Sequence, residues 1–438
     1  MGFADPRGVP LTARDSGSVA AFEEALGQIL AFAGDPVGAL DRLIEGDPSC
    51  VQAHLAKAAI YAWSLHPSFV GRAREALAAA EAAGPALDHE RRQAAAVDAW
   101  LGGRYDEACR EFDAILADEP RHLAALFFAH QADFFAGRTE ALELRPRRML
   151  EALPEDLPGR GFVLGMWAFG LEETARFGEA EEAGRAAVAA APRDVWAIHA
   201  VGHVLEETGR SDEGILWYGE REEDWAGNSY FAVHNAWHLA LYHLDREEEG
   251  AVLAIYDRFL APGRRSILLN LCDAAALLWR LHLAGLPAGA RWRTLADAFA
   301  AKYRPGCHVF DDVHAMLAFV GADRSAEAAR LMADLAGIAE GGDERARQLR
   351  RAGLPICRAI AAFGQGDWRS AVDLLSGLGE DRRLMTGSHA QRDILDLTLI
   401  EAAIRARETS LARELLERRL ERRPESARIR RDLSRLAA

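Results

Sequence analysis

Two short segments of the sequence each carry a pair of histidines four residues apart. WAIHAVGHVLEE, residues 196–207, contains His199 and His203, and FAVHNAWHLALYHL, residues 231–244, contains His234 and His238. Residues at this spacing lie on one face of a helix, and Glu206 joins the face of the first pair. Imidazole and carboxylate groups are ligands for zinc, iron, manganese or nickel. The spacing differs from that of the HExxH motif, so these segments do not contain the glutamate that acts as the general base in metalloproteases of that type.

Further candidate groups lie later in the chain, in LCDAAALLWRL, in VFDDVHAMLAF and after Ser388. Arg392, near the start of an expected helix, is a candidate for holding a carboxylate or phosphate, and an ion pair with Asp393 or Asp396 is the alternative. The candidate metal ligands are His199, His203, His234, His238 and His314, and the candidate catalytic groups are Glu206, Asp273, Asp312 and Arg392.

The elements that must position these groups are predicted to be helices. Alanine, leucine, glutamate and arginine dominate the composition, and alternating runs of Val, Ile and Thr are almost absent. GRYDEACREFDAILADEP, residues 103–120, is typical of a tetratricopeptide repeat, in which Gly103 permits the turn between two helices and Pro120 stops the second one. Helix-ending prolines recur at intervals of 37, 35, 34 and 38 residues, at Pro48, Pro85, Pro120, Pro154 and Pro192.

The sequence therefore predicts an all-α protein, a tetratricopeptide-like α-solenoid of about ten helical hairpins wound into a right-handed superhelix. Residues 1–16 are expected to form a flexible leader, and residues 17–438 a continuous array. His199 and His234 are separated by 35 residues, which is one repeat, so the two pairs should occupy equivalent places on neighbouring inner helices. We expect a polar pocket on the concave side, formed mainly by residues 193–320 and 388–396.

Composition excludes several classes of function. The net charge of −15 argues against non-specific binding to nucleic acid or to anionic membranes. The five cysteines are scattered and odd in number, which favours a reducing cytoplasm over a disulfide framework. The apolar segment SILLNLCDAAALLWRLHLAGL contains Asn270, Asp273, Arg280 and His282, so it is expected to be a buried helix and no membrane span.

Nearly the whole chain resembles the tetratricopeptide repeat protein 38 family. The resemblance is specific in HAVGHVLEETGRSDEGILWY, VHNAWHLALYHLDREEEGAVLAIYDRFL, CDAAALLWRLHLAG, FDDVHAML and SHAQRDILDLTLIEAA. Leu205 and His389 depart from the family's pattern. The family has no settled activity, so the resemblance implies a fold and a site but does not indicate a substrate. The positions that match the pattern are His199, His203, Glu206, His234, Asn235, Trp237, His238, Asp273, Asp312, His314, Gln391, Arg392 and Asp393.

Two functions remain open from the sequence. In the first, the histidines and carboxylates bind a divalent metal such as zinc, iron or manganese, or form a metal-free acid/base pocket, and the protein binds or converts a small molecule. In the second, the array is an interaction scaffold that holds a partner peptide in its groove. A purely structural alternative is that the histidines form hydrogen-bonded layers between helices, with Trp237 and Tyr242 packed beside them. No motif for an organic cofactor is visible, and the oligomeric state is not readable.

Overall fold

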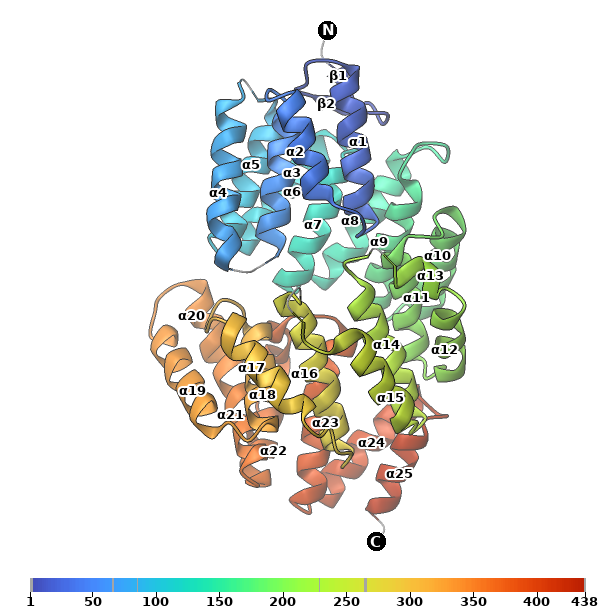
Figure 1. Cartoon of the computed structure of the whole chain (residues 1–438). Helices are drawn as coiled ribbons and strands as arrows, with labels where there is room; N and C mark the ends of the chain where they lie inside the picture. Colours follow the sequence, from blue (N-terminus) through green and yellow to red (C-terminus); the bar gives the residue numbers. More distant parts are fainter. Residues whose placement is uncertain (1–2, 65–66, 85, 228, 264–265, 437–438) are drawn as a thin grey trace. The chain divides into compact units, whose positions relative to one another are not determined.

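The computed structural model describes residues 3–64, 67–84, 86–227, 229–263 and 266–436 (Figure 1). These residues are almost entirely helical, and antiparallel helical hairpins follow one another along the chain. The predicted all-α, tetratricopeptide-like solenoid fold is thereby confirmed. The chain divides into two compact units, the first made of Met1–Val201 with Glu223–Phe231 and the second of Gly202–Glu222 with Ala232–Ala438.

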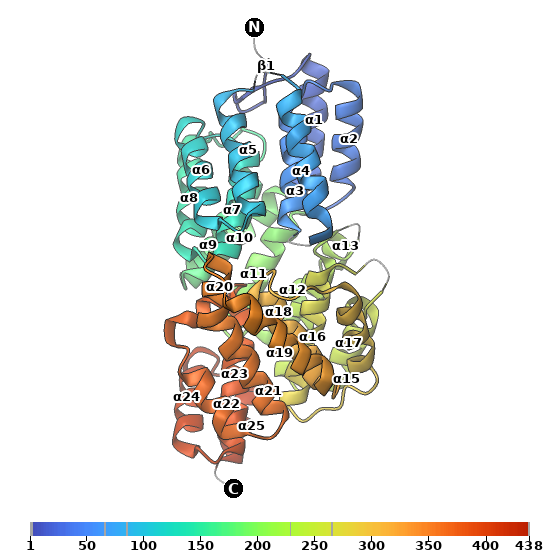
Figure 2. The ribbon, with the colours of Figure 1, turned by 90° about the vertical axis from the view of Figure 1, so that its left-hand side faces the viewer.

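The first unit consists of five helical hairpins preceded by a short strand pair. Figure 2 shows its helices running side by side. Helices α1 to α10 pair in order along the chain, and the unit also holds the first turns of α11 and a short helix, α13. The elements are β1 (Phe3–Ala4), β2 (Pro10–Leu11), α1 (Ser16–Leu30), α2 (Pro36–Gly46), α3 (Val51–Trp63), α4 (Pro67–Ala82), α5 (Asp88–Leu101), α6 (Tyr105–Asp118), α7 (Leu123–Ala136), α8 (Thr139–Ala152), α9 (Arg160–Glu173), α10 (Phe177–Ala190), α11 (Val195–Glu207) and α13 (Glu222–Trp225).

The turn residues predicted from the sequence act as expected. Gly103 and Gly137 have φ angles of 71° and 68°, the left-handed conformation that glycine adopts without strain where two helices meet. Of the predicted stop residues, Pro85 lies outside the described residues. The others follow the ends of α2, α6, α8 and α10, as predicted, at Pro48, Pro120, Pro154 and Pro192.

Residues 3–15 differ from the flexible leader that the sequence predicts. Strands β1 and β2 pair antiparallel, and the side chain of Val9 is buried. The guanidinium of Arg7 donates to Asp5 and to Glu23 of α1, each at 2.6 Å. The hydroxyl of Thr12 donates to Glu90 of α5 at 2.7 Å. Charged and polar contacts over long sequence separations therefore hold this segment against the first hairpins.

The second unit begins within α11 and continues the series of hairpins to the last described residues (Figure 1). Its elements are the remainder of α11, α12 (Ser211–Gly219), α14 (Ala232–Asp245), α15 (Glu249–Ile255), the π-helical turn η1 (Tyr256–Leu260), α16 (Leu268–Leu283), α17 (Arg291–Lys302), α18 (Val309–Gly321), α19 (Ser325–Ala339), α20 (Glu344–Gln348), the π-helical turn η2 (Leu349–Gly353), α21 (Leu354–Gly364), α22 (Trp368–Ser376), the 3₁₀ helix η3 (Gly379–Met385), α23 (His389–Arg405), α24 (Thr409–Arg422) and α25 (Ala427–Arg435).

The inner helices of the second unit close on one another. Helix α16 packs against α14 and α18, its neighbours in the series, and also against α23. The indole of Trp279 donates to the hydroxyl of Thr398 at 2.9 Å, and Arg280 donates to the carbonyl of Ala390 at 2.6 Å. Helix α16 is buried along nearly its whole length, as the sequence predicts for this apolar segment. No helix among the described residues combines the length and apolar character needed to cross a membrane.

The last helices of the second unit return to its first ones. Arg423, at the end of α24, donates to Glu207 of α11 at 2.7 Å. Ser426, which caps α25, donates to Asp245 at the end of α14 at 2.5 Å. These contacts, together with the packing of α23 on α16, join the last helices of the unit to its first ones.

Candidate metal site in the second unit

Three imidazoles from two helices meet in the second unit. His203 comes from α11, and His234 and His238 come from α14. The ring centroids of His203 and His238 lie 4.4 Å apart, and those of His234 and His238 lie 4.8 Å apart. Each of the three residues offers a ring nitrogen within 4.8 Å of the other two. Tetrahedral ligands with metal–nitrogen bonds of about 2.0–2.1 Å are roughly 3.3 Å apart, so shifts of about 1 Å at each ring close the site around an ion.

His199 lies one turn before His203 on the continuous helix α11 and is part of the first unit. It is buried beside Phe169 and Phe231, with ring centroids at 5.5 Å and 4.9 Å.

Two of the three imidazoles are held by carboxylates from other helices. Nδ1 of His234 lies 3.0 Å from both oxygens of Asp273 on α16. Nδ1 of His238 lies 2.9 Å from Oε2 of Glu206 on α11. When Nδ1 donates its proton to a carboxylate, Nε2 becomes the nitrogen that can bind a metal, and the carboxylate fixes the orientation of the ring.

Burial sets the charge state of the site. It lowers the pKa of His238 well below its usual range, and the neighbouring His203, His234 and Arg280 lower it further. The imidazole of His238 is therefore neutral at physiological pH, which is the form that binds metals. Burial also raises the pKa of Glu206 to about 7, although the nearby Arg423 opposes this.

Close packing between helices fixes the spacing of the site. The hydroxyl of Tyr242 donates to the carbonyl of Gly202 at 2.5 Å. A Cβ atom on Gly202 would clash with the hydroxyl of Tyr218, so any larger residue at this position beside His203 requires Tyr218 to shift. The indole of Trp237 stacks on His234, and the guanidinium of Arg280 lies 5.1 Å from the indole ring. The aromatic residues thus surround the histidines and support their orientation.

Three other candidate residues form their hydrogen bonds outside the histidine cluster. Nδ1 of His314 lies 2.7 Å from the carbonyl of Phe310 on its own helix, and the groups of potential metal ligands among the described residues do not include His314. Asp312 accepts hydrogen bonds from the hydroxyl of Tyr303 and from the backbone of Gly306, and so holds the loop before α18. Arg392 lies on the first turn of α23.

The two acidic neighbours of Arg392 are engaged by other arginines. Arg392 itself donates to the carbonyl of Gly387. Asp393 is bound by Arg419, and Asp396 lies 2.8 Å from Arg382. Arg392 therefore belongs to a basic region at the start of α23.

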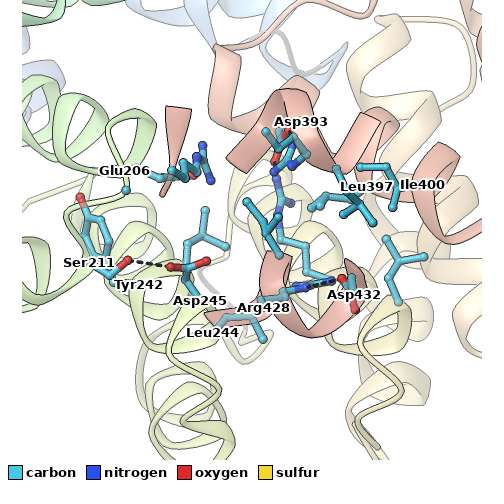
Figure 3. Close-up of a pocket in the computed structure, with 18 of the residues that line it drawn as sticks. Glu206, Ser211, Tyr242, Leu244, Asp245, Asp393, Leu397, Ile400, Arg428 and Asp432 are labelled. Carbon is cyan, nitrogen blue, oxygen red and sulfur yellow. Dashed lines mark hydrogen bonds and ion pairs between the residues drawn. The ribbon is translucent and has the colours of Figure 1, made fainter. Parts of the chain in front are cut away.

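A small cavity adjoins the histidine site on the side of Glu206. Its volume of about 60 Å³ gives room for about four water molecules. Figure 3 shows Glu206, Asp245, Asp393 and Arg428 directed into it from different helices. Glu206 thus contacts His238 with one oxygen and also lines the cavity.

Three arginines of this cavity were not predicted from the sequence, and Arg280, from the expected buried helix, is the fourth. The three are Arg419, Arg423 and Arg428. Arginine is abundant throughout the sequence, which indicates a bias of composition. Individual arginines that line a site therefore cannot be distinguished from the others by residue type. A signal does exist for Arg419, because it follows Ala412 and Leu416 on the buried face of α24, where an apolar residue is the usual choice.

No known family model matches the chain. Among solved structures, the chain is similar to one described as "Structure of Naa15/Naa10 bound to HypK-THB", with 14% sequence identity over 96% of this chain and 79% of that chain. The TM-score is 0.21, which is too low to relate the two folds, so nothing about this chain follows from it.

Proposed function

We propose that the second unit binds a divalent metal ion through His203, His234 and His238. The observation that carries this proposal is the pair of carboxylate–imidazole hydrogen bonds, at 3.0 Å from Asp273 to His234 and 2.9 Å from Glu206 to His238. Histidine ligands of metal ions are oriented in this way in most metalloproteins. An imidazole-rich set favours zinc or iron over magnesium or calcium, with manganese as a further candidate.

The enclosed surroundings of the histidine site favour a small molecule as the ligand or substrate that binds beside the metal. Helix α23 packs against α16, and the cavity beside Glu206 holds only about 60 Å³. A peptide or partner helix needs an open groove along several hairpins, whereas in this unit α23 contacts α16 and the end of α24 contacts α11. We therefore favour metal-dependent or acid/base chemistry on a small molecule over the scaffold function, with Glu206 and Asp273 as the groups beside the metal.

We also infer a relationship with the tetratricopeptide repeat protein 38 family. Its pattern matches thirteen positions of this chain, and these include the residues that lie together in the second unit. Repeat packing alone gives no reason for polar groups at these inner positions, whereas an ion site does. The residues concerned are His203, Glu206, His234, His238 and Asp273.

Metal analysis tests the proposal directly. Protein prepared without a histidine tag is loaded with zinc, ferrous iron or manganese, dialysed, and analysed by inductively coupled plasma mass spectrometry. We expect about one ion per chain in the wild type and a loss of that ion in the His203→Gln, His238→Gln double variant. His282→Gln is the matched control, because His282 belongs to the same unit and packs on Trp279 outside the cluster.

The outcome that contradicts the proposal is clear. A wild-type protein that retains far less than one ion after loading with each of the three metals has no such site. The same conclusion follows when the double variant, folded by circular dichroism, retains as much metal as the His282→Gln control.

A further inference from the structure

A second hollow of the second unit is lined mainly by arginine. It has a volume of about 200 Å³ and lies between η3, the first turns of α23 and the end of α24. Three carboxylates also line it, which leaves an excess of positive charge on a chain whose net charge is −15. The arginines are Arg382, Arg383, Arg392, Arg419, Arg422 and Arg423.

The three carboxylates are already engaged by arginines of the same hollow. Arg419 binds both oxygens of Asp393, with Nη2 at 2.8 Å from Oδ2. Arg423 donates to Glu207 at 2.7 Å, and Arg382 lies 2.8 Å from Asp396. The negative charges of the lining are therefore matched, and the excess positive charge comes from the remaining three arginines.

Two of these arginines, Arg383 and Arg422, have only exposed or more distant acidic contacts. Arg422 lies 3.8 Å from Glu207, which Arg423 already binds at a shorter distance. Arg383 reaches Glu380, whose side chain is 84% exposed and stands outside the lining. An exposed pair of this kind contributes little, so it leaves most of the charge of Arg383 available to a ligand in the hollow.

The base of the hollow is buried, which strengthens its electrostatic field. The side chains of Arg419 and Arg423 are only 10% and 14% exposed. Charges in such a setting are poorly screened by water. Burial raises the pKa of Asp393, yet the positive charges of Arg419, Arg423 and Arg280 outweigh it and hold that pKa below its usual range. The surroundings of Asp393 therefore stabilise negative charge.

We propose that this arginine hollow binds a compact oxyanion with at least two negative charges, a phosphorylated or polycarboxylate small molecule. The planar guanidinium group donates two parallel hydrogen bonds to phosphate or carboxylate oxygens, and the lining contains six such groups and no lysine. A volume of about 200 Å³ is below that of most drug-sized pockets, which fits a small oxyanion with its waters. This site is distinct from the histidine cluster, because none of its lining residues is a proposed metal ligand.

Calorimetric titration of the full chain tests the proposal with two probes, sodium pyrophosphate and sodium citrate, each against sodium chloride at equal ionic strength. We expect one of the two probes, or both, to bind the wild type, with affinity reduced at least about tenfold in the Arg392→Gln, Arg422→Gln double variant. The matched control is Arg413→Gln, Arg418→Gln, which removes two exposed arginines of α24 that lie outside the hollow.

Each result supports or overturns the proposal. Binding of pyrophosphate alone identifies a phosphoryl site, binding of citrate alone identifies a carboxylate site, and binding of both identifies a general oxyanion site. The proposal is overturned when neither probe binds, or when the two double variants lose affinity equally. Repeating the titration with the His203→Gln, His238→Gln variant separates this site from the metal site, since anion binding should persist there.

Discussion

Replacement of Asp273 by asparagine isolates the contribution of one carboxylate to the histidine site. Asp273 lies on α16, its side chain is 5% exposed, and both of its oxygens are 3.0 Å from Nδ1 of His234. Asparagine has nearly the same volume and keeps one carbonyl oxygen that accepts from the imidazole. The substitution therefore removes the negative charge and leaves the packing and the hydrogen bond largely in place.

The size of the effect follows from this geometry. A hydrogen bond to a charged group contributes about 1.5–3 kcal/mol, compared with about 0.5–1.5 kcal/mol for a neutral one. The imidazole N–H becomes a stronger donor when Nε2 binds a metal. Replacing the charged acceptor by a neutral one therefore destabilises the metal-bound state more than the metal-free state. We expect a loss of about 1.4 kcal/mol, which is about tenfold in metal affinity and lies within the range typical of such orienting carboxylates.

Competition with a chromogenic zinc chelator measures this affinity. The control is Asp311→Asn, which removes another buried carboxylate of the same unit, one that contacts Cys272 instead of a histidine. We expect its zinc affinity to stay within about twofold of the wild type. Unchanged affinity in Asp273→Asn would refute the orienting role of Asp273, and an equal loss in both variants would show a general effect of charge.

Three further predictions concern stability. Burial lowers the pKa of His130 to about 3, and neither ring nitrogen of this residue has a hydrogen-bond partner among the described residues. The histidine pKa of the unfolded chain is about 6.5, so between pH 3 and pH 6.5 the unfolded state binds more protons at this residue than the folded state does. The contribution of His130 to the free energy of unfolding is therefore complete above about pH 6.5. It is lost as the pH falls below that value, by about 1.4 kcal/mol per pH unit. Urea unfolding should show a flatter acid dependence in His130→Phe, and an unchanged slope would contradict the assignment. Gly202→Ala should cost about 1–3 kcal/mol, because the new methyl group meets Tyr218 at 2.2 Å, whereas Gly27→Ala meets no atom within 4 Å and should be tolerated. Arg7→Leu should cost about 3 kcal/mol by leaving its two carboxylate partners without a counter-charge, and a melting temperature equal to that of the wild type would count against a structural role for the N-terminal segment.

The sequence was informative wherever neighbouring hairpins repeat the same geometry. His203 and His238 are separated by 35 residues, which is one repeat, and equivalent positions of successive hairpins lie side by side. Their rings are accordingly 4.4 Å apart. Turn glycines and helix-ending prolines likewise act locally, so Gly103 and Pro120 could be placed from the sequence alone.

Contacts between distant hairpins could not be predicted in this way. Arg423 and Glu207 are 216 residues apart, and no repeat period relates them. Their pairing depends on the sum of small rotations along the whole unit, which a single sequence does not specify. Side-chain direction was also hidden, because His314 has the right residue type and position but its Nδ1 lies against the carbonyl of Phe310 on the same helix.

The closure of the second unit and the geometry of the histidine site depend on the same residues. Glu206 is buried between His238, at 2.9 Å, and the guanidinium of Arg423, at 3.9 Å, and Arg423 also binds Glu207. A buried carboxylate without a counter-charge costs about 3–5 kcal/mol, so an array that ended before α24 would expose Glu206 or protonate it. In either case the charge-assisted hydrogen bond that fixes the ring of His238 would weaken. The C-terminal helices therefore complete the site, although none of its imidazoles comes from them.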